Sequence, residues 1–267
     1  MSKSIFITGA ASGIGKATAL FFARQGWKVG LFDINEDGLK EVAKEIGHNS
    51  SMYKKLDVTN LDDWTNAINA FSEYTSGTCD LFFNNAGIAA HTGRIEDIPI
   101  NEAHNVVNIN LNGVINGIYS ILPLLKKTKK SMIMNTGSVG SFIPVPGAAI
   151  YSATKFAIRG LTESLNIEFS NYGIKVSEVN PWFTETPILD AEQVTNNMDG
   201  VLTRATIRKI STIHSPEKVA KKVFSIYHRR AIHNVIGFMG NISVFVMRYC
   251  PAIIRRMSRK MYSDYFS

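Results

Sequence analysis

Tyr151 and Lys155 stand four residues apart in the segment YSATK, a spacing that places both side chains on one face of a helix. An ammonium group beside a phenol favours the phenolate, so we expect this tyrosine to titrate below its usual pKa of about 10. Such a group can pass a proton near neutral pH. The spacing is common, however, and also fits two unrelated residues of an amphipathic helix. Its meaning depends on what the rest of the chain supplies.

The segments around this pair alternate between strand and helix patterns. Apolar, strand-like runs occupy residues 4–8, 27–33, 51–58, 79–87, 130–138, 174–181 and 232–237. Helical patterns fill residues 13–25, 35–46, 61–74, 101–126, 151–171 and 216–229, and Pro123 should kink or end the fourth of these. This alternation predicts βαβ units. We therefore expect an α/β chain with a doubly wound Rossmann-type fold of about seven parallel strands, in a single domain over residues 1–267.

A glycine-rich turn follows the first expected strand, in the segment TGAASGIG from Thr8 to Gly15. Glycine permits a tight turn and a close approach of the backbone to a pyrophosphate at a helix N-terminus. The glycine spacing, three residues and then one, differs from the usual dinucleotide fingerprint, and a plain glycine-rich turn is the alternative. Its position at the first βα turn favours dinucleotide binding by Gly9, Ser12, Gly13, Ile14 and Gly15.

Asp33 ends the second expected strand, where an acid can accept hydrogen bonds from both ribose hydroxyls of a dinucleotide. Its charge would repel the 2′-phosphate of NADP, and neither Ile34 nor Ser12 supplies a compensating positive charge. We therefore expect NAD(H) rather than NADP, with Ile34 beside the ribose. A capping role at the following helix is the alternative for Asp33.

Charge is distributed unevenly along the chain. From Leu202 to the end there are thirteen Lys and Arg against two acids, a net charge of +11, so the preceding residues carry −4. This asymmetry fits an anionic partner, either a membrane or nucleic acid, and solvated basic helices are the alternative. No apolar run reaches 18 residues, and the two cysteines have no metal spacing, so we expect a cytoplasmic protein without a bound metal.

Five motifs occur in order: TGxxxGxG at Thr8–Gly15, NNAG at residues 84–87, Asn110 in NINLNG, Ser138, and YxxxK at Tyr151–Lys155. In this order they resemble the short-chain dehydrogenase/reductase family, over about residues 3–190. Each motif alone is weak, but the ordered set is specific. The resemblance implies an oxidoreductase that interconverts an alcohol and a carbonyl compound by hydride transfer to or from NAD(H).

The resemblance also assigns the reaction to four residues. It implies that Tyr151 is the acid/base at the substrate oxygen and that Lys155 lowers its pKa and holds the nicotinamide ribose. It implies that Ser138 hydrogen-bonds the substrate oxygen, and that Asn110 kinks its helix and holds a water that relays protons. Positive charge near a tyrosinate and a donor at developing oxygen charge both agree with this chemistry.

Further cofactor contacts follow from the same resemblance. Asp57 would contact the adenine, with the Val58 backbone beside it, and the NNAG segment would line the adenosine side. The nicotinamide end would meet residues after the sixth strand. The full set is Asp57, Val58, Asn85, Ala86, Gly87, Pro181, Thr184 and Thr186.

One departure from the family pattern concerns the substrate side: Trp182 follows Pro181, where the family usually has glycine. The indole puts the local backbone conformation in doubt, because glycine's freedom is lost. The irregular residues 182–212 are expected to form a substrate lid. Apolar lid residues predict a hydrophobic substrate such as a retinoid, a steroid or a long-chain alcohol, which would contact Ser138, Tyr151, Trp182, Phe183, Ile188 and Leu189.

The C-terminal tail, residues 241–267, interleaves apolar and basic residues. A basic amphipathic helix of this kind can lie on an anionic membrane surface, and packing over the substrate cleft or against another subunit is the alternative. We expect no nucleic-acid binding, because large apolar side chains interrupt the basic ones. A homodimer or homotetramer is expected from the resemblance. A non-catalytic dinucleotide sensor or scaffold, and an NADP-dependent carbonyl reductase of a small substrate, remain as alternative functions.

Overall fold

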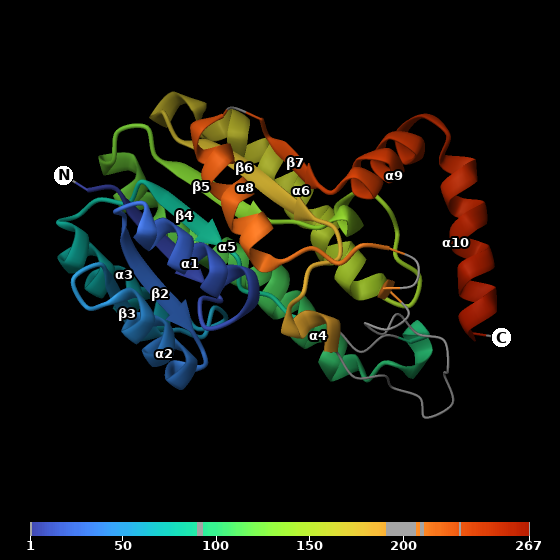
Figure 1. Cartoon of the computed structure of the whole chain (residues 1–267), viewed down its shortest axis with the longest axis horizontal. Helices are drawn as coiled ribbons and strands as arrows, with labels where there is room; N and C mark the ends of the chain where they lie inside the picture. Colours follow the sequence, from blue (N-terminus) through green and yellow to red (C-terminus); the bar gives the residue numbers. More distant parts are fainter. Residues whose placement is uncertain (1, 90–92, 191–206, 209–210, 230, 267) are drawn as a thin grey trace.

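Seven parallel strands form one sheet in the computed structural model, in the order β3-β2-β1-β4-β5-β6-β7 (Figure 1). The structure describes residues 2–89, 93–190, 207–208, 211–229 and 231–266. The expected Rossmann-type fold is confirmed. The strands are β1 Ser4–Thr8, β2 Lys28–Asp33, β3 Ser51–Lys55, β4 Leu81–Asn84, β5 Met132–Thr136, β6 Lys175–Pro181 and β7 His233–Ile236.

Helices cover both faces of the sheet, and most strands are therefore buried on both sides. On one face, apolar residues of the sheet pack against α1 (Gly13–Arg24), α2 (Glu36–Ile46) and α8 (Pro216–His228). On the other face they pack against α3 (Leu61–Thr75), α5 (Gly113–Lys127) and α6 (Ala149–Glu168). Ser215 caps α8 as its sequence indicates, with Pro216 at the first helical position.

The chain reverses direction across the sheet at β1, which lies between β2 and β4. From β1 the chain proceeds outward to β2 and β3 and then returns to β4 on the other side. In open α/β sheets, ligands bind in the crevice at such a switch point, beyond the carboxyl ends of the strands. The glycine-rich turn after β1 lies at this crevice.

The helix expected over residues 101–126 is interrupted. It consists of α4 (Ile100–Val107), a π-helical turn (Asn108–Asn112) and α5, which continues to Lys127. Pro123 does not end this helix. The two residues after it, Leu124 and Leu125, are buried in the core, and their burial stabilises the last turn by about 3–6 kcal/mol, against about 3 kcal/mol lost at the proline.

The tail forms two helices, α9 (Phe238–Tyr249) and α10 (Pro251–Phe266), that extend away from the body of the molecule (Figure 1). Proline disfavours helical conformation in the residue before it, so the break falls at Cys250. Neither helix, nor any other in the described part of the chain, is long and apolar enough to cross a bilayer.

Candidate active site

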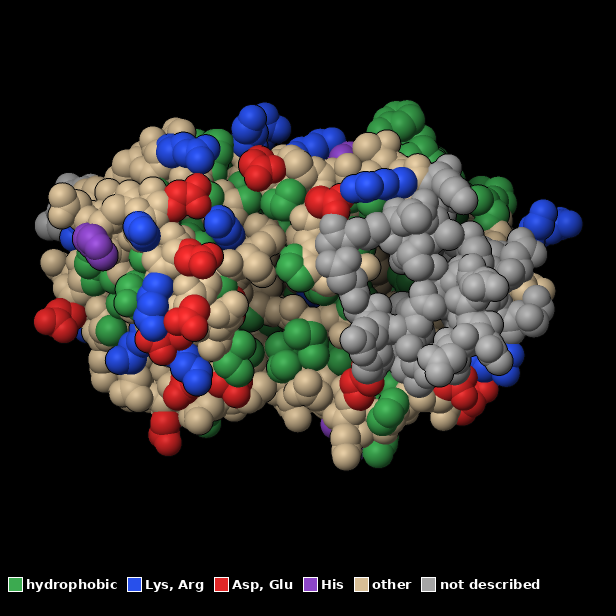
Figure 2. Space-filling model, turned by 60° about the horizontal axis from the view of Figure 1, so that its bottom comes forward, with side chains coloured by type: hydrophobic (Ala, Val, Ile, Leu, Met, Phe, Trp, Pro, Cys, Tyr) green, Lys and Arg blue, Asp and Glu red, His purple; other side chains and the backbone are tan. Residues whose placement is uncertain are grey.

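A cavity of about 1140 Å³ opens at the carboxyl ends of the strands, and apolar side chains border the hollow seen in Figure 2. Most of the residues expected at the cofactor and the substrate line this one cavity. Of the expected set, Gly15 and Asn110 do not line it. The lining members are Gly9, Ser12, Gly13, Ile14, Asp33, Ile34, Asp57, Val58, Asn85, Ala86, Gly87, Ser138, Tyr151, Lys155, Pro181, Trp182, Phe183, Thr184, Thr186, Ile188 and Leu189.

The glycine-rich turn has the geometry of a phosphate cradle. Gly9 and Gly13 adopt φ values of +67° and +51°, which side chains other than glycine rarely tolerate. A Cβ at Gly13 would lie 3.0 Å from Cγ2 of Thr186, across the cavity. Gly15 lies inside the first turn of α1, where a Cβ would collide with the carbonyl oxygen of Gly9. The turn thus leaves room for an anionic group at the positive end of α1.

Asn85 ties this turn to the centre of the sheet. Its amide nitrogen donates to the carbonyl of Thr8 at 3.0 Å, and its backbone N–H donates to the Thr8 hydroxyl at 2.9 Å. Its amide oxygen accepts a hydrogen bond from the hydroxyl of Thr136 at 3.1 Å. The amide is therefore occupied in holding the strand ends together, and Asn85 faces the cavity as part of its wall.

The carboxylate of Asp33 is fixed at the rim of the cavity. One oxygen accepts from the backbone N–H of Ala11 at 3.0 Å and the other from the backbone N–H of Asn35 at 2.9 Å. Each oxygen keeps a lone pair for a further donor. The helix cap that the alternative assigned to Asp33 is made instead by Asn35, whose side chain accepts from Gly38.

Asp57 and Val58 lie at the adjacent wall, after β3. The carboxylate of Asp57 accepts from the backbone and the hydroxyl of Thr59, at 2.9 and 2.8 Å. The carbonyl oxygen of Val58 accepts from the indole of Trp64 at 2.9 Å and from the amide of Asn116 at 3.1 Å. Both residues are thus held rigidly in the cavity wall.

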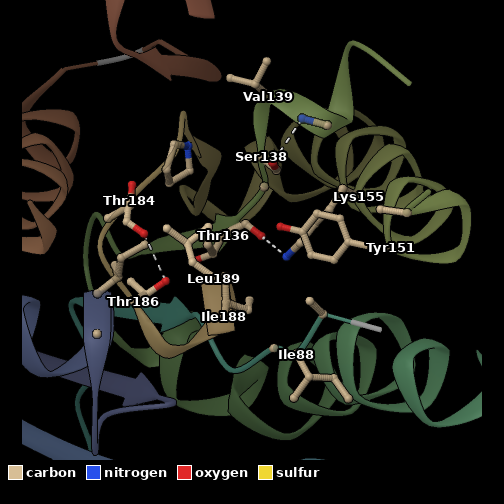
Figure 3. A pocket seen from close by; sticks show the side chains of 18 of the residues that line it. Ile88, Thr136, Ser138, Val139, Tyr151, Lys155, Thr184, Thr186, Ile188 and Leu189 are labelled. Atoms are coloured by element: carbon tan, nitrogen blue, oxygen red, sulfur yellow. Dashed lines mark hydrogen bonds between the residues drawn. The ribbon is translucent and has the colours of Figure 1, made fainter. Parts of the chain in front are cut away.

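Tyr151 and Lys155 point into the opposite side of the cavity from α6 (Figure 3). Burial raises the pKa of Tyr151, and a hydrogen bond with Ser138 acts in the opposite direction. The expectation that this pKa is lowered is therefore wrong for the protein chain alone, because desolvation of the phenolate outweighs its stabilisation by neighbouring groups.

Lys155 is 5% exposed, and its ammonium donates to the carbonyl oxygen of Thr136 at 2.8 Å. Its Nζ lies 5.5 Å from the centre of the Tyr151 ring. Burial lowers the pKa of Lys155 to about 8, while the charge of Glu178 raises it. Thr136 did not stand out in the sequence; it reaches the site because it ends β5, between the strands that carry Asn85 and Pro181.

Ser138 begins a short 3₁₀ turn, Val139–Ser141, and caps it. Its hydroxyl accepts from the backbone N–H of Gly140 at 3.0 Å. Its own N–H donates to the hydroxyl of Ser141 and to the amide oxygen of Asn180, both at 3.1 Å. These bonds fix the direction of the serine side chain toward the cavity, where it is half-buried.

Asn110 lies in the π-helical turn between α4 and α5 and is 1% exposed. Its amide makes two hydrogen bonds of 2.8 Å with the backbone N–H and carbonyl of Ile88. The side chain thus holds the cavity wall from behind. The π turn agrees with the expected kink, because it widens the helix at this residue.

Trp182 does not adopt a positive φ, so glycine is not required after Pro181. Its backbone N–H donates to the carbonyl of Ile236 on β7, and its indole N–H donates to the hydroxyl of Ser211. The indole also packs near Gly240 at the start of α9. Trp182 therefore forms part of the wall and supports the tail. Most of the expected lid, residues 191–206 and 209–210, lies outside the described residues.

The tail contributes to the far end of the cavity, which agrees with the alternative that it packs over the cleft. Ser243 of α9 and Ile254, Met257 and Ser258 of α10 line it. Ile254 is buried, whereas Met257 is 63% exposed. The other lining residues that we did not expect are largely apolar: Leu56, Ile88, Ala89, Ile109, Val139, Ile143, Pro144, Val145, Pro146, Ala148, Pro187 and Ile207.

Comparison with known proteins identifies similar chains. The model of the short chain dehydrogenase family matches residues 3–197. A cyclohexanol dehydrogenase of Acinetobacter sp. is 31% identical over 228 residues, or 83% of this chain and 86% of the relative. A 3-alpha-(or 20-beta)-hydroxysteroid dehydrogenase of Mycobacterium bovis is 33% identical over 71% of this chain and 72% of its own.

Solved structures agree in fold. A short chain dehydrogenase/reductase from Burkholderia phymatum in complex with NAD superposes with a TM-score of 0.82 and 27% identity, covering 94% of this chain and 95% of that one. Other solved structures of similar fold hold NADH or 5-hydroxy-NADP. These relatives therefore indicate dinucleotide binding without deciding between NAD and NADP.

Proposed function

The chain belongs to the short-chain dehydrogenase/reductase family, and from that premise we propose that it is an NAD(H)-dependent oxidoreductase of an apolar alcohol and its ketone or aldehyde. The observation that carries this proposal is the single cavity with Asp33 and the glycine turn at one end and Ser138, Tyr151 and Lys155 at the other. Bound NAD(H) would supply the hydride acceptor or donor.

The residues fit the cofactor at each end. The cradle at Gly9 and Gly13 has room for phosphate, and the fixed carboxylate of Asp33 can accept from ribose hydroxyls. At the reacting end Tyr151 holds or accepts the proton of the substrate oxygen, and the Ser138 hydroxyl donates to that oxygen as charge develops on it. The ammonium of Lys155 favours the tyrosinate by its charge.

The proposed substrate is apolar, because the cavity beyond Tyr151 is bordered by aliphatic residues from three parts of the chain. Ile88, Val145 and Ile254 represent these parts, and no charged side chain other than Lys155 lines this end among the described residues. The relatives named for cyclohexanol and a hydroxysteroid act on ring alcohols, which supports this class. A site of this size and polarity suits a molecule larger than a short alcohol.

A panel of alcohols and ketones tests the proposal by NADH absorbance. We expect measurable turnover with cyclic or steroid alcohols and long-chain alcohols, and kcat/KM at least about 100-fold lower with ethanol or 2-propanol, which bury far fewer methylene groups. Equal or better turnover of the short alcohols would contradict an apolar substrate.

We also propose that the tail docks on an anionic lipid surface, which would place the cytoplasmic enzyme at a membrane. Four apolar side chains of α9 share one exposed face: Phe238, Ile242, Phe245 and Tyr249, between 40% and 79% exposed. Arg248 is exposed on the same helix, and Arg255, Arg256, Arg259 and Lys260 are exposed on α10, the next helix of the tail. Apolar side chains that insert beside basic ones are the pattern by which helices bind anionic bilayers.

Substitution of Phe245 by glutamate should weaken binding to vesicles of phosphatidylserine and phosphatidylcholine at least about tenfold, because a buried aromatic ring is lost and a repelled charge is added. Leu61→Glu is the matched control, since Leu61 is 61% exposed on α3, outside the tail. Co-sedimentation measures both. Unchanged sedimentation of Phe245→Glu would show that this face does not meet lipid.

A homodimer is the proposed assembly. Exposed apolar side chains on α5 and α6, namely Tyr119, Phe156 and Ile167, offer a surface on the side of the sheet away from α8. This surface is separate from the α9 face, so dimer formation and lipid contact do not compete.

A further inference from the structure

A chain of hydrogen-bonded polar groups runs from the surface to Ser138, through residues that the proposed reaction does not use. It begins at Glu163 on α6, passes through His233 on β7 and Glu178 on β6, and reaches Asn180. The amide of Asn180 then accepts from the backbone N–H of Ser138. Glu178 is the central member of this chain, and it is 0% exposed.

The register of the sheet explains how these groups meet. Glu178 and His233 are direct neighbours on the parallel strands β6 and β7. Side chains two residues apart on a strand share a face, so Asn180 lies on the same side as Glu178. The residue that Asn180 holds, Ser138, follows the neighbouring strand β5. The series of hydrogen bonds thus follows one face of three adjacent strands, β7, β6 and β5, to the active site.

The hydrogen bonds of Glu178 to His233 and Asn180 both use Oε1, while Oε2 is buried without a partner among the described residues. Nδ1 of His233 lies 2.8 Å from Oε1 of Glu178, and Nε2 lies 2.7 Å from Oε1 of Glu163. An imidazolium can donate from both nitrogens, and both nitrogens of this ring face carboxyl oxygens. These two contacts raise the pKa of His233, that with Glu178 most strongly. On the other side, the charge of Glu178 acts on the ammonium of Lys155.

The same carboxylate orients the amide of Asn180. A carboxylate only accepts, so it selects the Asn180 Nδ2 donor, which lies 2.9 Å from Oε1. The amide oxygen is then directed toward the N–H of Ser138 at 3.1 Å. A Cβ at Gly137 would collide with this oxygen, which shows how closely the turn packs on it. The N–H of Ser138 and the carboxylate of Glu178 thus select the same orientation of the amide from its two ends.

We propose that Glu178 is a positioning residue, which acts through Asn180 on the direction of Ser138 and by its charge on Lys155. The inference rests on the proposed function for its effect on turnover, but its effect on Lys155 does not need a substrate. The groups around Lys155 are Tyr151 on its own helix, the Thr136 carbonyl that accepts from it on β5, and Glu178 on β6, next to Val179, which pairs in register with Thr136. Glu178 is the acid among them.

The first test reads the charge of Lys155 directly. Brief acetylation of the whole protein at a series of pH values, followed by mass spectrometry of the Lys155 peptide, gives the pH at which this amine becomes reactive. We expect a midpoint near the wild-type pKa of about 8 and, in Glu178→Gln, a midpoint lower by about one pH unit, because the raising charge is removed. Glu168→Gln, the same change at an exposed residue of α6, should not move it.

The second test separates positioning from folding. Glu178→Gln keeps an acceptor for Asn180 and His233, so its kcat near pH 7 should stay within about threefold of wild type while the alkaline limit of its pH profile moves down. Glu178→Leu removes the acceptor and should lower kcat at least about tenfold with NADH binding unchanged. If Glu178→Leu does not fold, Glu178→Gln decides the charge effect, and Asn180→Ala, which removes the acceptor of the Ser138 N–H, decides the positioning effect: an unchanged kcat would overturn it.

The outcomes are distinct from failure of the proposed function. An unshifted Lys155 midpoint in Glu178→Gln overturns the charge effect, whether or not a substrate is known. A folded Glu178→Leu that keeps wild-type kcat overturns the positioning effect. Absence of turnover by the wild-type protein, with the Lys155 midpoint shifted as expected, would instead count against the proposed function alone.

Discussion

Replacement of Tyr151 by phenylalanine is expected to lower kcat at least about 1000-fold while NADH binding stays within about twofold of wild type. In the proposed reaction the phenol exchanges a proton with the substrate oxygen, and phenylalanine keeps the ring, whose centre lies 5.5 Å from Nζ of Lys155. The change removes one oxygen from a half-buried position, so little stability should be lost. Steady-state absorbance and a fluorescence titration with NADH measure the two quantities.

The matched control is Tyr172→Phe, which removes the same oxygen from a tyrosine that is 52% exposed at the end of α6. It should leave both kcat and NADH binding unchanged. A Tyr151→Phe variant that turns over at the wild-type rate would contradict the assignment of the acid/base. A variant that no longer binds NADH would show that the substitution disturbs the cofactor site and would leave the decision to Ser138→Ala.

The bare protein holds its reacting tyrosine against ionisation, since burial raises the pKa of Tyr151 and lowers that of Lys155. Both shifts have the same cause: a site that excludes water disfavours either charge alone. Charges placed in the site therefore have large effects on this pair. Glu178 is such a group, because it is a buried acid whose charge acts on the lysine.

The strand positions could be predicted from the sequence because each strand is an apolar run that ends at a turn residue. The cofactor end of the cavity could be predicted for the same reason: Thr8, Asp33 and Asn85 each follow a strand of one parallel sheet, so their positions converge at one edge. The interruption of the helix at Asn108–Asn112 could be expected only from the resemblance, which implies a kink at Asn110. Periodicity does not show it, because the π turn depends on hydrogen bonds that Asn110 makes with Ile88, 22 residues away.

The contacts that depend on tertiary packing were also beyond the sequence. Glu178 is the acid of β6, and its proposed role becomes visible only when β7 places His233 beside it. Ile254 and Met257 lie in a tail whose apolar residues fit a membrane face as well as a cavity wall. Both helices of the tail bear apolar residues on more than one side. The periodicity of the sequence alone therefore does not decide which of these residues face the cavity.

The choice of cofactor has the second large expected effect. Wild-type protein should bind NADH at least about 100-fold more tightly than NADPH, because the 2′-phosphate would approach the fixed carboxylate of Asp33. Ile34 is 61% exposed beside it, so an arginine at this position has room to reach a phosphate. The double variant Asp33→Ser, Ile34→Arg should therefore prefer NADPH.

Fluorescence titration of NADH and NADPH into the wild-type protein, the double variant and Asp33→Asn separates the effect of the carboxylate charge from the effect of the added arginine. Asp33→Asn keeps the shape of the side chain and removes its charge, so the preference for NADH should fall below about tenfold without reversing. Reversal requires the added arginine, which pairs with phosphate through a bidentate contact. Tighter binding of NADPH by the wild-type protein would contradict the assignment of Asp33, because its carboxylate is held by Ala11 and Asn35 and has no freedom to turn away from the ribose.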